Sequence, residues 1–240
     1  MAITGAAGLL ATWEAGLAEA PAGRALLLHR TARPDDAGIT AVPLGERESD
    51  LFALRRALFG ERMQVRTECR ACGADMEFEL DAGEFARTLS APESPVVRLA
   101  EGGWEIVFRL PSAADLTSAA RTADPRAALL ARCLVSAEHD GTAQPAGALP
   151  VPVRRRIAEA VEAADPGADV TLTIACPECG TGTRAELDIA SYLWTELDAW
   201  ARDLLLDVHL LATAYGWSEP EILALSPLRR RYYLELCADV

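Results

Sequence analysis

One stretch of the chain occurs twice, and this repeat constrains the fold more than any other feature of the sequence. Residues 65–85 read VRTECRACGADMEFELDAGEF and residues 172–192 read LTIACPECGTGTRAELDIASY, at a constant offset of 107 positions. The match includes a CxxCG motif and the Glu-Leu-Asp sequence that follows it. The pattern predicts two copies of one unit, each made of a strand, a tight turn and a second strand.

The spacing of the cysteines indicates a shared metal site. Each turn places two thiolates three positions apart, and the glycine after the second cysteine lets the backbone curl around the sulfurs. A structural zinc ion takes four ligands in a closed tetrahedron, and none of the three histidines, His29, His139 and His209, is near either turn in the sequence. We therefore predict one structural Zn²⁺ per chain, held by the four cysteines of the repeats: Cys69, Cys72, Cys176 and Cys179.

The sequence leaves three alternatives to a zinc site open. The turns could be degenerate and metal-free, they could carry a redox dithiol, or they could form two disulfides. A thioredoxin-like dithiol is expected to open a helix inside a βαβ unit, and that context is absent here. Disulfides are disfavoured in a chain of this size that we expect to be unsecreted.

The composition bounds the class of protein. The 240 residues can bury one good core or two small ones around a shared metal, and no apolar run approaches the length that spans a bilayer. The formal charge of −13 repels phosphate backbones, which weakens the usual inference from a zinc ribbon to nucleic-acid binding. All 23 cationic side chains are arginine. We expect a cytoplasmic protein.

The first sixty residues predict a short helix, a strand pair and a second helix. Apolar positions in residues 1–24 have helical spacing up to Pro21 and Gly23. Two compact apolar runs, Ala25 to His29 and Ile39 to Leu44, favour strands. An amphipathic helix then leads to Gly60, a glycine that is typical of a helix C-terminus.

The segment between the two repeats predicts a hairpin followed by two helices. Two apolar runs flank Glu101-Gly102-Gly103, Ser112 can cap a helix with Asp115 three residues later, and Asp124-Pro125 can begin another helix that runs through Leu134. Cys133 is interpreted as core packing. Residues 138–150 are rich in Gly, Ala and Pro and predict a loop.

The residues after the second repeat predict a helical tail. Apolar side chains recur at steps of three and four from Leu193 to Tyr215, and Gly216 ends this pattern. Ser218 and Ser226 are each placed to cap a further helix. The predicted fold is therefore α+β, with a duplicated β-CxxCG-β zinc-ribbon core, a central β/α insert and a helical C-terminal tail. The predicted parts are residues 1–60, residues 61–190 with the insert at 86–150, and residues 191–240.

The tail also carries the residues that we expect to contact a partner. Arginine and aromatic side chains dominate the energetics of protein interfaces, and both gather here. The predicted contacts are Trp217, Arg229, Arg230, Arg231, Tyr232 and Tyr233. HExxH, GxSxG, GxGxxG and a convincing Cys/His pair are all missing from the sequence, so we predict that the protein is not an enzyme.

Several segments together resemble the baseplate hub assembly chaperones of contractile-tailed phages, relatives of which are encoded in phage-like contractile injection systems. These segments are LGERESDLFALRRALFG, the paired CxxCG motifs, FRLPSAADL and the tail YGWSEPEILALSPLRRRYY. The resemblance is loose over residues 25–60 and good over 61–135 and 151–238. It implies a protein that binds baseplate, hub or tail proteins during assembly and catalyses no reaction. Metal-binding turns are not universal in such proteins, so the zinc prediction depends on the cysteines themselves.

Two other functions are weighed against this one. The runner-up is a zinc-ribbon regulator that binds nucleic acid through residues 218–236, which loosely imitate a helix-turn-helix. Salt-dependent duplex binding would support it. The third is a thiol oxidoreductase, which a redox titration of the four thiols near neutral pH would support.

Overall fold

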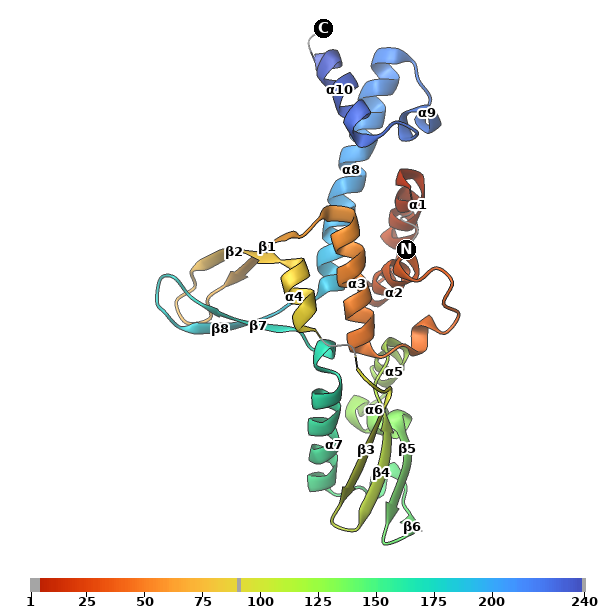
Figure 1. Cartoon of the computed structure of the whole chain (residues 1–240), viewed down its shortest axis with the longest axis vertical. Coiled ribbons are helices and arrows are strands. Elements are labelled where there is room, and N and C mark those ends of the chain that lie inside the picture. Colours follow the sequence, from red (N-terminus) through yellow and green to blue (C-terminus); the bar gives the residue numbers. More distant parts are fainter. Residues whose placement is uncertain (1–4, 90–91, 239–240) are drawn as a thin grey trace.

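One long helix, α8 (Ile189–Tyr215), runs from the middle of the molecule to its C-terminal end (Figure 1). The computed structural model describes residues 5–89 and 92–238, which form an elongated molecule with an arm that projects from its middle (Figure 1). The other helices are α1 (Ala6–Leu17), α2 (Pro21–Ala32), α3 (Leu44–Phe59), α4 (Ala82–Thr88), α5 (Ala113–Ala119), α6 (Pro125–Cys133), α7 (Val151–Ala164), α9 (Glu219–Leu223) and α10 (Pro227–Ala238), with 3-10 turns η1 (Ile39–Ala41), η2 (Ala146–Ala148) and η3 (Pro166–Ala168). The strands are β1 (Arg62–Glu68), β2 (Asp75–Asp81), β3 (Val96–Glu101), β4 (Trp104–Arg109), β5 (Leu134–His139), β6 (Thr142–Ala143), β7 (Thr171–Ala175) and β8 (Gly182–Glu186). Hairpins, a four-cysteine cluster and long C-terminal helices confirm the predicted α+β class.

The middle of the molecule is a helical core in which α1, α2 and α3 pack against the first half of α8. The α8 side chains that face this core recur at steps of three and four, as the sequence predicts: Leu193, Leu197, Ala201 and Leu204 are all buried. They pack with apolar residues of α1 and α3, among them Trp13 and Phe52. No helix in the described residues is long and apolar enough to cross a membrane.

The strand pair predicted near the N-terminus is wrong. Ala25 to His29 lies inside α2, and the core of the second predicted strand forms the turn η1. A short apolar run is compatible with either a strand or a buried helix, and here packing against α3 and α8 selects the helix. Pro21 begins α2 at its first turn, where the N–H that proline lacks would have no helical partner.

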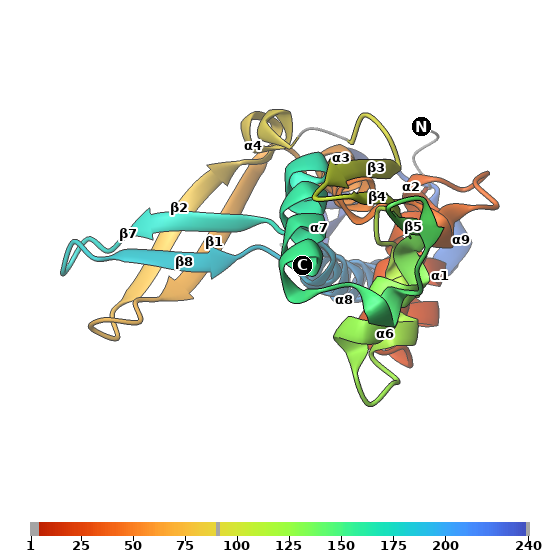
Figure 2. The same ribbon diagram turned by 90° about the horizontal axis from the view of Figure 1, so that it is seen from below.

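The arm consists of two antiparallel hairpins, β1–β2 and β7–β8, which come from the two copies of the repeat. Both project from the helical core in the same direction and lie side by side (Figures 1 and 2). In β2 the side chain of Met76 is buried whereas Glu77 and Glu79 are exposed. This alternation confirms the half-buried strand predicted from the sequence.

The segment between the repeats forms a four-stranded sheet in the order β3-β4-β5-β6, with α7 packed on one face. Ile106 and Phe108 of β4 pack with Ile157 of α7 in a separate apolar cluster. The predicted hairpin over residues 96–110 is confirmed, but β5 and β6 were not predicted. The predicted helix runs through Leu134, whereas α6 ends at Cys133, because pairing with β4 draws the following residues into the sheet.

Candidate metal centre and partner surface

The two CxxCG turns have nearly the same backbone geometry. The N–H of Gly73 donates to the carbonyl of Cys69 at 2.8 Å, and the N–H of Gly180 donates to the carbonyl of Cys176 at 2.9 Å. The two glycines have φ angles of 73° and 71°, in the left-handed region where a side chain would be strained. The glycine of each motif therefore closes the turn that brings two sulfurs to one side.

The repeat continues past the second strand into a capped helix. Asp81 accepts a hydrogen bond from the N–H of Glu84 at 2.7 Å and begins α4. At the equivalent position, Asp188 accepts one from the N–H of Ser191 at 3.0 Å and begins α8. The shared Glu-Leu-Asp sequence thus marks the end of a strand and the start of a helix in both copies.

The structure brings the four predicted cysteines into one cluster. Their sulfurs all lie within 4.8 Å of one another, and the Cys69–Cys179 and Cys72–Cys176 Sγ distances are both 3.7 Å. A tetrahedral zinc ion with Zn–S bonds of about 2.3 Å separates its sulfurs by about 3.8 Å. Cys69 and Cys176 are buried, Cys72 and Cys179 are exposed, and all are free thiols. The group fits a metal ion held by four thiolates.

The electrostatics of the cluster favour a cation at its centre. Backbone N–H groups of Cys72 and Ala71, with the Thr183 hydroxyl, lower the pKa of Cys69 to about 6. The N–H of Ala74 acts to lower the pKa of Cys72, but the neighbouring Cys179 and Cys69 sulfurs raise it to about 12. The hydroxyl and N–H of Thr181 also lower the pKa of Cys179, so two of the thiols ionise readily while the neighbouring sulfurs oppose the ionisation of Cys72. A bound divalent cation removes this repulsion and allows all four to deprotonate.

Few apolar side chains surround the cluster. Among the described residues, Met76 is buried against the sulfurs, and Ala74 and Ile174 are partly buried there. Nearer the helical core, the Tyr192 hydroxyl donates to the carbonyl of Gln64 at 3.2 Å and accepts from its N–H at 3.0 Å. The first hairpin is therefore tied to α8 at its base, and farther out the four cysteines bring the two hairpins together.

Two of the three aromatic residues predicted to contact a partner, Trp217 and Tyr233, pack against each other. Trp217 stacks on Tyr215 with ring centroids 4.6 Å apart and meets Tyr233 edge to face at 4.9 Å. Both belong to an apolar cluster that includes Leu211 and Ile222. Trp217 and Tyr233 thus hold α9 and α10 against the end of α8 and offer a partner only part of their surface.

The three arginines of the tail occupy different environments. Arg230 is 7% exposed, and its Nε donates to Asp207 of α8 at 3.1 Å. Arg231 forms an exposed ion pair with Glu235 on its own helix, whereas Arg229 is exposed. Arg230 therefore anchors α10 to α8. This differs from the expectation that all three arginines are accessible to a partner.

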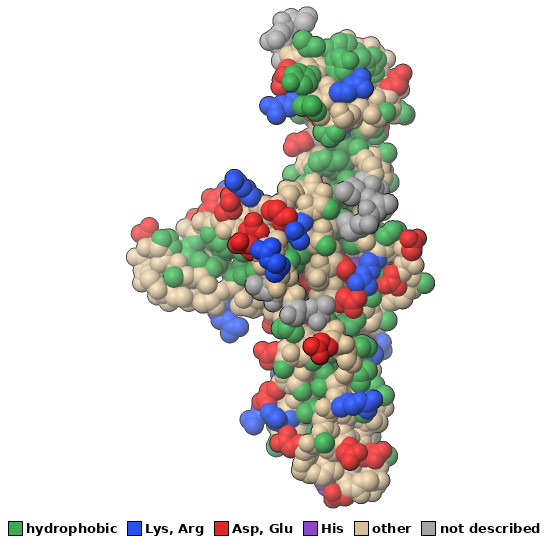
Figure 3. All heavy atoms as spheres, in the orientation of Figure 1, with side chains coloured by type: hydrophobic (Ala, Val, Ile, Leu, Met, Phe, Trp, Pro, Cys, Tyr) green, Lys and Arg blue, Asp and Glu red, His purple; other side chains and the backbone are tan. Residues whose placement is uncertain are grey.

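The outer face of α10 carries Tyr232, which was predicted to contact a partner, and two apolar side chains that were not predicted to do so. Leu228, Tyr232 and Leu236 recur every four residues and are 65%, 60% and 59% exposed. Hydrophobic side chains gather at this end of the molecule in the space-filling view (Figure 3). Helical spacing of apolar residues on both faces of α10 was the signal in the sequence that could have identified this surface.

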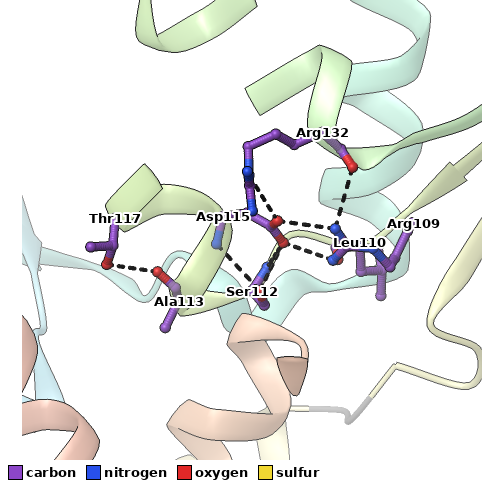
Figure 4. A network of polar contacts seen from close by, with 7 residues as sticks. All are labelled: Arg109, Leu110, Ser112, Ala113, Asp115, Thr117 and Arg132. Carbon is purple, nitrogen blue, oxygen red and sulfur yellow. Dashed lines mark hydrogen bonds and ion pairs between the residues drawn. The ribbon is translucent and has the colours of Figure 1, made fainter. Parts of the chain in front are cut away.

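Asp115 is the centre of a buried polar network that the sequence predicts only in part. Its carboxylate accepts hydrogen bonds from Arg109 at 2.7 and 3.0 Å, from Arg132 at 3.3 Å, and from the Ser112 hydroxyl and N–H at 2.7 and 3.0 Å (Figure 4). Burial alone would raise the pKa of Asp115, but the Arg109 guanidinium and the Ser112 groups hold it well below its usual range. The capping pair was predicted, and the two arginines were not. The network ties β4, α5 and α6 together.

A second buried carboxylate caps a helix from a distant part of the chain. The first residues of α3 have no side-chain cap of their own, and the N–H of Gly45 donates to Asp165 at 3.1 Å. Asp165 is 2% exposed, and its other oxygen is buried without a hydrogen-bond partner among the described residues. Burial raises the pKa of Asp165. No local sequence pattern could have found a cap supplied 120 residues away.

Comparisons with known proteins place the chain in a family. A family model described as T4 bacteriophage base plate protein matches residues 27–184, which include α3, both cysteine turns and the whole sheet with α7. Comparison with curated proteins and with solved structures found no match. Since the matched segment covers well over half of the chain, the protein belongs to the T4 bacteriophage base plate protein family.

Proposed function

We propose that the protein is a non-enzymatic assembly factor that binds structural proteins while a baseplate or hub is built, in a phage tail or a phage-like contractile injection system. Membership of the base plate protein family is the observation that carries this proposal. The predicted cytoplasmic location agrees with it, because such particles assemble in the cytoplasm of the producing cell.

We further propose that Cys69, Cys72, Cys176 and Cys179 hold one Zn²⁺ per chain. Four protein ligands leave a tetrahedral ion no open position for substrate or water, so the metal serves structure and not catalysis. The ion joins two turns that are separated by 103 residues of sequence, between Cys72 and Cys176. Its role is to keep the two hairpins of the arm together.

The surface that we assign to the partner is the outer face of α10. Leu228, Tyr232 and Leu236 form its apolar stripe, and the exposed Arg229 lies beside Leu228. Aromatic, aliphatic and arginine side chains of this kind supply the anchors of protein interfaces. Trp217 and Tyr233 support the same helix from its inner side.

Two observations favour a protein partner over nucleic acid. The chain carries a net charge of −13, which repels a phosphate backbone. In the segment that loosely imitates a helix-turn-helix, Arg230 and Arg231 are already paired with Asp207 and Glu235. The outer face of α10 is therefore more apolar than basic, and apolar contact suits a protein surface.

The test is to replace Leu228, Tyr232 and Leu236 together by serine in the cell that produces the particles. These side chains are exposed, so the purified variant should keep its circular dichroism spectrum and metal content. We expect fewer intact sheathed particles by electron microscopy, approaching the number seen when the whole gene is deleted. A matched control replaces Leu17 and Val135, which are 47% and 62% exposed elsewhere, by serine.

Two results would count against the proposal. Unchanged particle numbers in the gene deletion would contradict the assembly role. A normal yield of particles from the α10 variant, together with a loss in the gene deletion, would leave the role standing and show that α10 is not the contact surface.

A further inference from the structure

The two edges of the four-stranded sheet differ in length. β6 at one edge has two residues, whereas β3 (Val96–Glu101) at the other has six and lies at the margin of the sheet (Figure 1). An edge strand presents backbone N–H and carbonyl groups that no neighbouring strand satisfies, and a longer edge presents more of them. β3 is therefore the edge of this sheet at which a further strand can pair.

The hairpin geometry identifies the groups of β3 that face away from β4. Gly102-Gly103 is a two-residue turn with φ angles of 58° and 82°, so its closing pair, Glu101 and Trp104, exchanges hydrogen bonds. Bonded and non-bonded pairs alternate along an antiparallel ladder, which leaves the N–H and carbonyl groups of Arg98 and Ala100 pointing outward. Among the described residues, no hydrogen bond reaches these four groups on the outward side.

The hydrogen bonds at the start of β3 agree with this assignment. The N–H of Leu110 donates to the carbonyl of Pro95 at 2.8 Å, which continues the odd-numbered positions that bond toward β4. The outward groups of Val96 are engaged by the Ser94 side chain: the N–H donates to Oγ at 3.2 Å, and Oγ donates to the carbonyl at 3.0 Å. The unpaired part of the edge is therefore residues 98–100.

An apolar cavity of about 310 Å³ lies beside this part of β3, between the sheet and the start of α7. Arg156 and Glu101 at its rim form an ion pair at 2.9 Å, so the formal charges of the lining cancel. A cavity of roughly 150 Å³ already holds benzene. This cavity has room for one large uncharged side chain. Six apolar residues line it: Leu99, Trp104, Ile106, Pro150, Pro152 and Val153.

The cavity and the unpaired backbone groups are in register with each other. Leu99, which lies between the two outward-facing residues, packs on the α7 side of the sheet with Ile106 and Val153. A strand that pairs with Arg98 and Ala100 places its intervening residue opposite Leu99, with that side chain on the α7 side. In β-strand addition, the main-chain hydrogen bonds supply affinity and pockets for alternate side chains supply specificity.

We propose that β3 binds an extended segment of another protein as an added antiparallel strand, with a large apolar side chain opposite Leu99 in the cavity. Every other strand pair of this sheet is antiparallel. That the bound protein is a tail component rests on the assembly role proposed above. The cavity and the outer face of α10 lie toward opposite ends of the molecule, so one chain can hold two components at once (Figure 1).

A second copy of the chain suits this edge less well. In any pairing of β3 with another β3, the Leu99 side chain of the second copy packs in the apolar cluster of its own sheet and leaves the cavity unfilled. The net charge of −13 on each chain also opposes self-association. The structure therefore favours a different protein as the source of the added strand.

The experiment selects binders from a displayed library of random peptides of about ten residues, the length of a long strand, against the purified full-length protein. We expect one position to be fixed as Leu, Phe or Trp. Methylating the backbone nitrogen of either residue next to this position should weaken binding roughly tenfold or more, because those N–H groups face β3. Methylating the nitrogen of the apolar residue itself, which faces away from β3, should leave the affinity unchanged.

Two pairs of variants test the same contacts from the side of the protein. Ala100→Pro removes an outward N–H at an exposed position, which an edge strand tolerates, whereas Ala100→Val keeps this N–H. Pro152→Trp fills the cavity from an exposed position, and Val151→Trp adds the same ring at an exposed position outside the cavity. The first variant of each pair should bind the peptides roughly tenfold or more weakly, and the second should bind them as the wild type does.

Three results would overturn the inference. These are a selection without any peptide that depends on both Ala100 and the cavity, methylation effects that do not alternate along the peptide, and wild-type dimers that Ala100→Pro dissociates. The methylated peptides are measured on the wild-type protein, so they test the pairing independently of whether a variant folds. Because the protein is purified, the outcome is also independent of particle assembly. A failure of the assembly role would appear in the particle counts and not here.

Discussion

Replacing Asp115 by alanine removes the acceptor on which β4, α5 and α6 converge. Loss of one partner of a buried ion pair typically costs about 3–5 kcal/mol. The side chains of Arg109 and Arg132 are 34% and 45% exposed, so their guanidinium groups can regain water and reduce this cost. The Ser112 N–H and hydroxyl, which are buried, instead lose their acceptor. We therefore expect a loss of about 3 kcal/mol in the free energy of unfolding.

Calorimetry and urea denaturation at pH 7 measure this loss. For a chain of this length, about 3 kcal/mol corresponds to a fall of roughly 6–12 °C in Tm. The matched control is Glu235→Ala, which removes an exposed ion pair with Arg231 and should cost less than about 0.5 kcal/mol. An Asp115→Ala variant no less stable than this control would refute the account of the network.

The same substitution predicts a pH dependence. The pKa of Asp115 is held below its usual range in the folded protein, so the folded state prefers the carboxylate. The stabilisation is fully present above the unfolded pKa of about 3.9 and is lost as pH falls through the folded pKa. The difference in stability between the wild type and Asp115→Ala should be constant from about pH 5 to 8 and shrink below about pH 4. A difference that grows on acidification would contradict this sign.

Three further predictions concern the metal, the cap of α3 and the anchor of α10. Elemental analysis should find one zinc per chain. Replacing any of the four cysteine ligands by serine should lower the zinc content, whereas Cys133→Ala and Cys237→Ser should leave it unchanged. A zinc content well below one equivalent in folded, unchelated protein would contradict the site. Asp165→Ala should cost about 1 kcal/mol in urea denaturation, because the Gly45 N–H loses its acceptor, while Asp165→Asn keeps an acceptor and serves as the control. Burial raises the pKa of Asp165, so the wild type should exceed Asp165→Ala in stability most at acid pH, and this difference should shrink as pH rises through the folded pKa. A stability difference that grows with pH would refute this prediction. Arg230→Ala should destabilise the packing of α10 by about 1–2 kcal/mol, because Asp207 loses its partner. Faster hydrogen exchange that is confined to α9, α10 and the end of α8 would verify this prediction.

The ligands and the helix caps illustrate what could be predicted from local sequence. The CxxCG spacing, the glycine at the left-handed position and the Asp that caps the helix after each second strand all act within a few residues, so the sequence records them directly. The length of α8 was predicted for the same reason, since its apolar period and Gly216 lie on one continuous stretch. The local pattern could not distinguish between two structures that the residues favour about equally, such as a strand and a helix at Ala25 to His29.

By itself, the sequence determined the duplicated hairpin, the four cysteines and the amphipathic faces of the long helices, because each is written in the spacing of neighbouring residues. Only the tertiary structure decided that the two turns meet with their sulfurs within 4.8 Å, that β5 joins β4, and that Arg230 is buried against Asp207 while Tyr232 faces outward. These features depend on which distant segments come into contact, and contacts of that kind are set by the packing of the whole chain and leave no periodic signal in the residues that make them.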